Sequence, residues 1–281
     1  MIPVYNKVKK TELDTIMKNY INMNKLRKYG KPPFGLAVIH GGPGAPGEMA
    51  PVARELSDFG GVLEPLQTAV TVEGQVRELK EVLEGHSDLP VTLIGFSWGA
   101  MLSFIFTARH PHLVKKLILI GSGPYEEKYT ECVAKTRINR LGKEDLENFI
   151  RLTETLNDPS TKNRNEALCN FGKLMSKADT YDPLPHKDEV LECNYESFKG
   201  VWEEVSELRS KGKLLEIGKE IRCQVVAIHG DYDPHPFEGV RDPLSGVLKD
   251  FRFILLEKCG HKPWIERKAK KRFYSLLRNE I

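Results

Sequence analysis

The sequence predicts an α/β fold with a mostly parallel central sheet, helices on both of its faces and a helical segment inserted into it. Short apolar runs rich in Val, Ile and Leu alternate with helical segments, which is typical of a parallel sheet covered on both faces. From about Tyr125 to Gly218 these runs stop, and charged amphipathic segments replace them. We therefore expect a core domain of residues 1–122 and 218–281, and a helical cap at residues 123–217.

Composition narrows the class of protein. A chain of 281 residues can bury one sizeable core and carry an inserted subdomain. Its net charge of +3 is too small to favour a nucleic acid or another polyanionic partner. No apolar run is long enough to span a membrane, and the N-terminus lacks the apolar centre of a signal peptide. Five cysteines without metal-ligand spacing favour reduced thiols in a cytoplasmic protein.

The elements follow from short apolar runs, turn residues and helical spacing. The first thirty residues are ambiguous, since Leu13–Tyr20 suits either a short helix or part of a strand, while Ile21–Tyr29 alternates as a strand does. Further strands are expected at 34–39, 62–66, 91–94, 116–120, 224–229 and 251–256. Core helices are expected at 49–59, 72–83, 100–109, between 237 and 249, and at 265–279. Helices of the insertion are expected at 129–141, 144–156, 163–177 and 195–211.

The most informative stretch joins the strand at 91–94 to the helix at 100–109. Between them lies GFSWG, residues 95–99, which has the form G-x-S-x-G. A strand that turns at once into a helix needs residues without a Cβ on both sides of the bend, and two glycines supply them. Ser97 at the apex is then exposed in a strained backbone, as in a nucleophile elbow. Such pentapeptides also occur by chance, so the interpretation depends on the surroundings.

A second glycine-rich loop follows the strand at 34–39 and reads HGGPG, residues 40–44. In nucleophile-elbow enzymes an early strand–helix loop supplies one oxyanion-hole N–H, and the residue after the nucleophile supplies the other. Gly42 and Trp98 are the candidate donors. A plain tight turn is the alternative interpretation of this loop.

The serine also needs a base and an acid. An imidazole must take the hydroxyl proton, and a carboxylate must orient that imidazole. In nucleophile-elbow enzymes the chain order is serine, then the acid, then the histidine. Asp233 and His261 follow this order, and each comes directly after a strand at the sheet edge where Ser97 lies. Asp231 competes for the role of the acid, and His235 is the close rival to His261.

With these motifs the chain resembles an α/β-hydrolase, and most closely the proline iminopeptidase group. The motifs that carry the resemblance are HGGPG at 40–44, GFSWG at 95–99, GDYD at 230–233 and GHKPW at 260–264. It covers roughly residues 20–123 and 218–281, and related esterases and amidases share part of it. The resemblance implies the α/β-hydrolase fold, a Ser97–His261–Asp233 triad, an oxyanion hole at Gly42 and Trp98, and no metal or cofactor.

Two departures from the iminopeptidase pattern bear on the substrate. Phe96 stands where the group commonly has glycine, so its bulk should reshape the acyl pocket. Pro234 follows the candidate acid, where iminopeptidases often carry an acidic residue that binds the substrate amine. Glu203 and Glu204 of the cap are candidates to replace that contact, although one charged face of a surface helix is the favoured interpretation of them.

The sequence therefore predicts a serine hydrolase that forms an acyl-enzyme on a small molecule or short peptide. An iminopeptidase-like aminopeptidase is the leading hypothesis. A carboxylesterase or thioesterase is the alternative, and a ligand-binding protein that keeps the fold without turnover is a third. The sequence leaves the oligomeric state open.

Overall fold

The computed structural model describes residues 25–281. The expected segment Leu13–Tyr20 lies outside this range, as do the first residues of the expected strand at 21–29, whose remainder forms β1 (Leu26–Tyr29). In the described chain seven strands form one sheet in the order β1-β3-β2-β4-β5-β6-β7. Only the β1–β3 pair in this sheet is antiparallel. The predicted mostly parallel α/β fold is confirmed.

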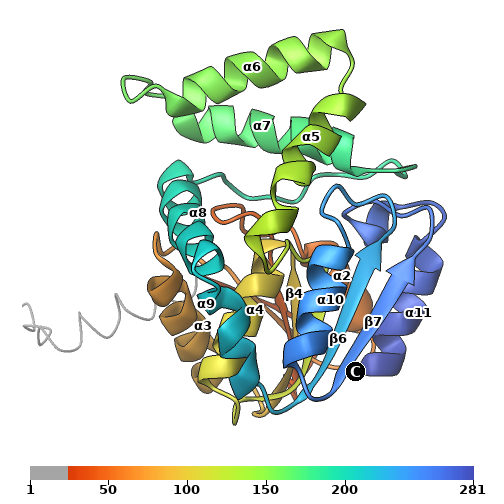
Figure 1. Cartoon of the computed structure of the whole chain (residues 1–281). Helices are drawn as coiled ribbons and strands as arrows, with labels where there is room; N and C mark the ends of the chain where they lie inside the picture. Colours follow the sequence, from red (N-terminus) through yellow and green to blue (C-terminus); the bar gives the residue numbers. More distant parts are fainter. Residues whose placement is uncertain (1–24) are drawn as a thin grey trace, which may run out of the picture.

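The elements lie close to their expected positions (Figure 1). The other strands are β2 (Leu36–Ile39), β3 (Val62–Pro65), β4 (Val91–Phe96), β5 (Val114–Ile120), β6 (Gln224–Gly230) and β7 (Phe251–Leu256). The helices around the sheet are α2 (Ala50–Leu56), α3 (Val72–His86), α4 (Trp98–Arg109), α8 (Tyr195–Ser210), α9 (Lys213–Glu216), α10 (Glu238–Val247) and α11 (Lys270–Glu280). The remaining helices are α5 (Glu131–Arg140), α6 (Lys143–Asn157) and α7 (Arg164–Asp179), and three short 3₁₀ turns lie at Glu127–Tyr129, Ile217–Glu220 and Pro263–Ile265.

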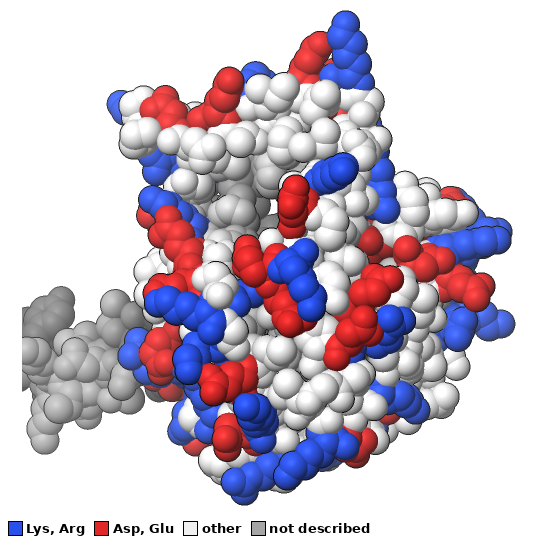
Figure 2. All heavy atoms as spheres, in the orientation of Figure 1, with Lys and Arg blue, Asp and Glu red and all other residues white. Residues whose placement is uncertain are grey.

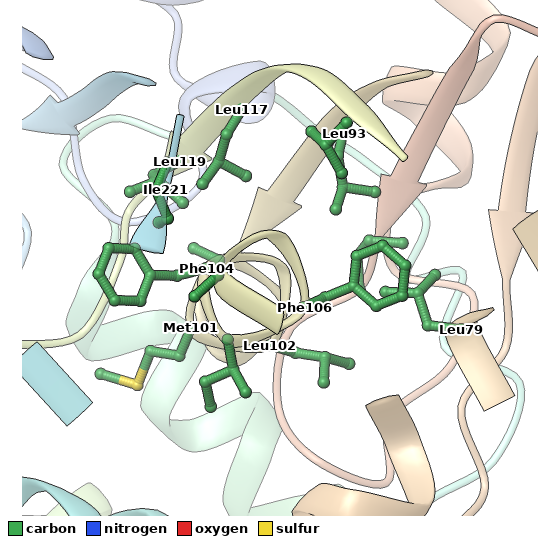
Figure 3. Packing of buried hydrophobic residues seen from close by; sticks show 14 of the residues in the cluster. Leu79, Leu93, Met101, Leu102, Phe104, Phe106, Leu117, Leu119 and Ile221 are labelled. Atoms are coloured by element: carbon green, nitrogen blue, oxygen red, sulfur yellow. The ribbon is translucent and has the colours of Figure 1, made fainter. Parts of the chain in front are cut away.

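Helix α4 lies at the centre of the core on one face of the sheet. All of its residues from Trp98 to Ala108 are buried, because the helix is apolar on every side and has protein around it. Figure 3 shows Phe104 and Phe106 on this helix among leucines of β4 and β5. This burial anchors the N-terminus of α4, where the elbow lies, to the centre of the sheet.

A second apolar cluster covers the opposite face of the sheet. There α2 and α11 pack against the strands, with Phe273 of α11 and Leu56 of α2 fully buried. The sheet is thus a buried middle layer, as the near-continuous apolar strands predicted. No helix within residues 25–281 is long and apolar enough to cross a membrane.

The inserted helices divide into two groups by their packing. Helices α5, α6 and α7 lie above the sheet edge (Figure 1), and α6 and α7 share a small apolar cluster that includes Leu156 and Leu168. Helix α8 begins in that cluster with Tyr195 and then buries Val201 and Val205 in the main core, where it packs beside α3. We infer that the cap proper consists of α5, α6, α7 and the segment up to α8, a shorter unit than the expected 123–217.

The cap contains a disulfide. Cys169 of α7 is bonded to Cys193, just before α8, with a Cα–Cα distance of 5.6 Å. The expectation that every cysteine is a reduced thiol is therefore wrong for this pair, whereas Cys132, Cys223 and Cys259 are free. Spacing in the sequence does not reveal the pair, because α7 must first bring its residues beside the returning segment. The expectation of reduced thiols followed from the general rule that disulfides persist mainly in oxidising surroundings and are rare in cytoplasmic proteins.

We predict that the unfolded, unreduced protein exposes three reactive thiols and that reduction raises the number to five. The Cys169→Ser/Cys193→Ser variant should lose about 3 kcal/mol of the free energy of unfolding, since the crosslink restricts the unfolded chain. Thiol titration and urea unfolding measure the two effects. Cys132→Ser is the matched control and should leave the urea midpoint nearly unchanged. Five reactive thiols before reduction would contradict the disulfide.

Candidate active site

Ser97 lies at the junction of β4 and α4 in the strained conformation predicted for an elbow. Its backbone has φ 53° and ψ −116°, in a region that residues with a Cβ rarely adopt. Close packing on both sides holds it there. A Cβ at Gly95 would collide with the carbonyl oxygen of Gly99, and one at Gly99 would collide with that of Ile39. The Ser97 N–H donates to the carbonyl of Ile120 on β5 at 2.9 Å, which ties the turn to the neighbouring strand.

Two backbone N–H groups are available at this end of the sheet. No residue in the described range accepts a hydrogen bond from the N–H of Gly42, which is half-buried, or of Trp98, which is buried. His40 fixes the glycine loop: its Nδ1 donates to the Gly41 carbonyl at 2.8 Å, and its Nε2 accepts from the Gln67 N–H at 3.2 Å. Burial lowers the pKa of His40, which keeps the ring neutral and able to accept. The Trp98 side chain points into the core, where Nε1 donates to Gln75 at 2.8 Å.

The loops after β6 and β7 bring a carboxylate and an imidazole together. Asp233 Oδ2 lies 2.6 Å from His261 Nδ1, and both residues are buried. A carboxylate only accepts hydrogen bonds, so Nδ1 carries the proton and Nε2 is left as the basic nitrogen. The rival acid Asp231 lies elsewhere, since its Oδ1 accepts the Cys259 N–H at 3.1 Å. The structure thus pairs His261 with Asp233 rather than with Asp231.

Three histidines surround the Asp233 carboxylate. Besides His261, His235 contacts Oδ1 through Nδ1 at 2.7 Å, and His229 Nε2 lies 3.5 Å from Oδ2. Burial acts to raise the pKa of Asp233, but His261, His229 and His235 hold it well below its usual range. Burial lowers the pKa of His235 to about 4, so this ring is neutral at pH 7. Asp233 therefore carries its negative charge at pH 7.

Glu266, which the sequence analysis did not single out, positions the His261 loop. Its side chain is fully buried, and its two oxygens accept three backbone N–H groups at 2.8–2.9 Å, those of Tyr181, Asp182 and Gly260. The first two donors belong to the chain that leaves the cap after α7, and the third precedes His261. This carboxylate therefore joins the end of the cap to the loop that carries the imidazole. A glutamate five residues after GH is too weak a pattern to have revealed this role.

A cavity of about 610 Å³ lies between the cap and the sheet edge. On the side of the sheet edge the cavity is lined by Gly42, Phe96, Ser97, His235 and His261. Its cap side is largely apolar and includes Leu168, Phe171, Met175, Leu191, Phe198 and Trp202. The Phe96 ring packs 4.8 Å from the His261 ring, measured between centroids, and forms part of the cavity wall.

Two ion pairs line the same cavity. Lys262 Nζ lies 2.6 Å from Glu48 Oε1, and Arg137 of α5 forms a bidentate pair with Asp179 of α7 at 2.6 and 2.8 Å.

On the outer surface, Lys and Arg side chains are interspersed with Asp and Glu on the face shown in Figure 2. That face therefore presents charge of both signs.

The structure does not bring Glu203 or Glu204 to the cavity. Glu204 Oε2 accepts the Val72 N–H at 2.7 Å at the start of α3, and Glu203 is exposed beside Lys199. Both line a separate groove on the outside of α8. The hypothesis that they bind a substrate amine is therefore corrected: Glu204 stabilises the first turn of α3, and Asp188 and Glu192 are the cavity carboxylates that form no ion pair with a described residue.

Comparison with known proteins agrees with this geometry. Residues 43–268 match the family described as the alpha/beta hydrolase fold. A pimeloyl-[acyl-carrier protein] methyl ester esterase of Chromobacterium violaceum is 27% identical over 195 residues, 66% of this chain and 68% of the esterase. A proline iminopeptidase of Lactobacillus helveticus is 24% identical over 263 residues, 84% of this chain and 86% of its own. The crystal structure of VinJ superposes with a TM-score of 0.62 at 18% identity, over 90% of this chain and 93% of VinJ.

The chain belongs to the α/β-hydrolase family, and it is a hydrolase. The expected superfamily and enzyme class are thus confirmed. The relatives are described as enzymes that differ in the bond they cleave, so the family defines the class of protein and leaves the substrate open.

We predict that Glu266→Gln lowers the free energy of unfolding by about 1–3 kcal/mol, because the amide nitrogen of Gln would face a buried N–H and leave it unpaired. Urea unfolding measures the loss. The matched control is Glu257→Gln on the exposed loop after β7, which should stay within about 0.5 kcal/mol of the native chain. Equal stability of the two variants would show that the three hydrogen bonds of Glu266 do not hold the loop.

Proposed function

We propose that the protein is a serine hydrolase in which Ser97 is the nucleophile, His261 the general base and Asp233 the orienting acid. The observation that carries the proposal is the strained Ser97 at the floor of a cavity that also contains His261, whose Nδ1 is held by buried Asp233. The free Nε2 of His261 is the nitrogen able to accept the Ser97 proton.

The reaction proceeds by acyl transfer. Ser97 Oγ attacks the substrate carbonyl while His261 Nε2 takes its proton, and the N–H groups of Gly42 and Trp98 donate to the oxyanion. His261 then gives the proton to the leaving group, and the C–O or C–N bond breaks to leave an acyl-serine. Water, activated by the same nitrogen, attacks the acyl-serine and releases the acid. Each proton that His261 takes is returned, so the enzyme is restored.

The preferred substrate is a carboxylic ester with an apolar acyl or alkyl group. The cap side of the cavity is largely apolar, and the carboxylates of Glu48 and Asp179 are already paired with Lys262 and Arg137. A buried carboxylate in such a pair is a poor partner for an added ammonium, since exchange would leave the original cation unpaired. The sequence match to a methyl ester esterase supports this preference.

Removal of an N-terminal residue from a peptide is the second candidate. It is favoured by the match to a proline iminopeptidase and by Asp188 and Glu192, which line the cavity. Either carboxylate is available to bind an ammonium, but both lie on exposed parts of the chain before α8.

We expect an alkyl phosphonate ester to label Ser97 and no other serine, because among residues 25–281 only this serine lies at a strained turn in the cavity that also contains His261. Ser97→Ala should lose nearly all turnover, about 10⁶-fold in the analogous change, while keeping its melting temperature. Intact mass and peptide mapping locate the adduct. Ser103→Ala in the same helix is the control and should keep both labelling and turnover. An unlabelled native protein, or a Ser97→Ala variant with normal turnover, would contradict the serine mechanism.

A matched substrate panel separates the two candidate functions. We expect p-nitrophenyl esters of medium-length acyl chains to give a higher kcat/KM than prolyl anilide, and N-acetylation of an aminoacyl anilide to change its rate little. A site built to recognise an ammonium would discriminate by up to about 10⁴-fold between the free and the acetylated amine. Discrimination of that size, abolished by Glu192→Gln or Asp188→Asn, would overturn the esterase assignment in favour of the aminopeptidase.

A further inference from the structure

The Asp233 carboxylate has an imidazole on each oxygen. His261 Nδ1 lies 2.6 Å from Oδ2, and His235 Nδ1 lies 2.7 Å from Oδ1, which also accepts the backbone N–H of His235 at 2.9 Å. The Asp233 side chain is fully shielded from solvent, and the two rings lie 4.7 Å apart between centroids. A triad needs only one of these imidazoles, so His235 is a group that the reaction described above does not use.

We propose that His235 is a positioning residue: its Nδ1–H holds the Asp233 carboxylate in the orientation that His261 needs and limits how strongly that carboxylate stabilises the His261 imidazolium. This inference rests on the proposed triad. A carboxylate that donors approach at both oxygens shares its negative charge between them, so each donor weakens the attraction of the carboxylate for the other.

The loop around His235 is held so that the ring keeps this position. His229 Nε2 donates to the carbonyl oxygen of His235 at 2.9 Å, and His229 itself is buried at the end of β6. Because burial lowers the pKa of His235 to about 4, the ring is a neutral donor over the range in which a serine hydrolase works. It therefore orients Asp233 without adding a second cation beside His261.

Apart from Lys173, Asp188 and Glu192, which line the cavity and form no ion pair with a described residue, the charged and titratable groups near this cluster are fixed by partners of their own. They are Arg137 of α5 with Asp179 of α7, Lys262 with Glu48, His229 on β6, and Glu266 with its three backbone donors. A substitution at His235 leaves these pairs in place. A change in the pH dependence of such a variant then reports on the Asp233–His261 pair.

His235 also lines the cavity, so it has a rival role as the general base itself. The two roles predict opposite results. A base is required for turnover at every pH, whereas a positioning donor sets the pH at which turnover begins. Two substitutions of His235 separate the two roles. His235→Phe keeps a ring and removes the N–H donor, whereas His235→Asn keeps an N–H donor at the position of Nδ1.

The test is the pH profile of kcat/KM for an ester substrate with the full chain, His235→Phe and His235→Asn. In His235→Phe the carboxylate has lost one hydrogen-bond donor, so it binds the His261 imidazolium more strongly and the acid limb of the profile moves to higher pH. The midpoint of the acid limb should move up by about half to one pH unit, with a loss of about tenfold on the plateau. His235→Asn should return the midpoint to that of the native enzyme.

Three outcomes would overturn the inference. An acid limb that keeps its midpoint while the whole profile falls would show that His235 only fills space. Loss of turnover in His235→Phe to the level of Ser97→Ala, with the melting temperature unchanged, would make His235 the base. A midpoint that moves equally in both variants would show that the donor is irrelevant. Phosphonate labelling of Ser97 in the native chain is scored separately, so failure of the serine mechanism is distinguished from failure of this inference.

Discussion

The buried negative charge of Asp233 is the constraint on which the rest of the site depends. A carboxylate removed from water is costly unless hydrogen-bond donors surround it. The sheet supplies them, because the parallel strands β5, β6 and β7 end at one edge and their loops converge. These loops lie so close together that the residue at position 121, just after β5, is glycine. Gly121 has φ 51°, and a Cβ there would lie 3.0 Å from His261 Nδ1 and 3.3 Å from Asp233 Oδ2. The Asp233–His261 pair thus leaves little room for a side chain at position 121, on the loop after β5.

The cap is coupled to this charge through the backbone of His261. The His261 N–H donates to the carbonyl of Asp179 at 2.9 Å, and the carboxylate of Asp179 binds Arg137 from another cap helix. Glu266 adds a second connection, because it joins the chain that leaves α7 to the residue before His261. A displacement of α7 would therefore disturb the imidazole directly. The cap covers the cavity and also helps to hold the loop of His261.

The sequence predicted what short-range patterns determine: the strands, most helices, the elbow and the order in which polar residues follow the strands. It did not predict contacts that exist only once distant segments meet, such as the Cys169–Cys193 disulfide or the three donors on Glu266. The error at Glu203 and Glu204 has a geometrical cause. Residues of a helix are about 100° apart around its axis, so Trp202 faces the cavity while Glu204, two positions later, faces the start of α3. Adjacency to Trp202 in the sequence therefore brings neither glutamate to the cavity.

The charges that line the cavity have a structural role before any role in substrate binding. Lys262 directly follows the imidazole, and its partner Glu48 lies beside the glycine loop, since a Cβ at Gly41 would lie 2.7 Å from Glu48 Oε2. Burial acts to lower the pKa of Lys262, but the charge of Glu48 and its hydrogen bond raise it overall, so the pair remains ionised. This one ion pair connects the glycine loop at 40–44 to the loop that carries His261. Because Lys262 and Glu48 are already bound to each other, we expect selectivity for a substrate to depend on the apolar wall of the cavity and on Phe96.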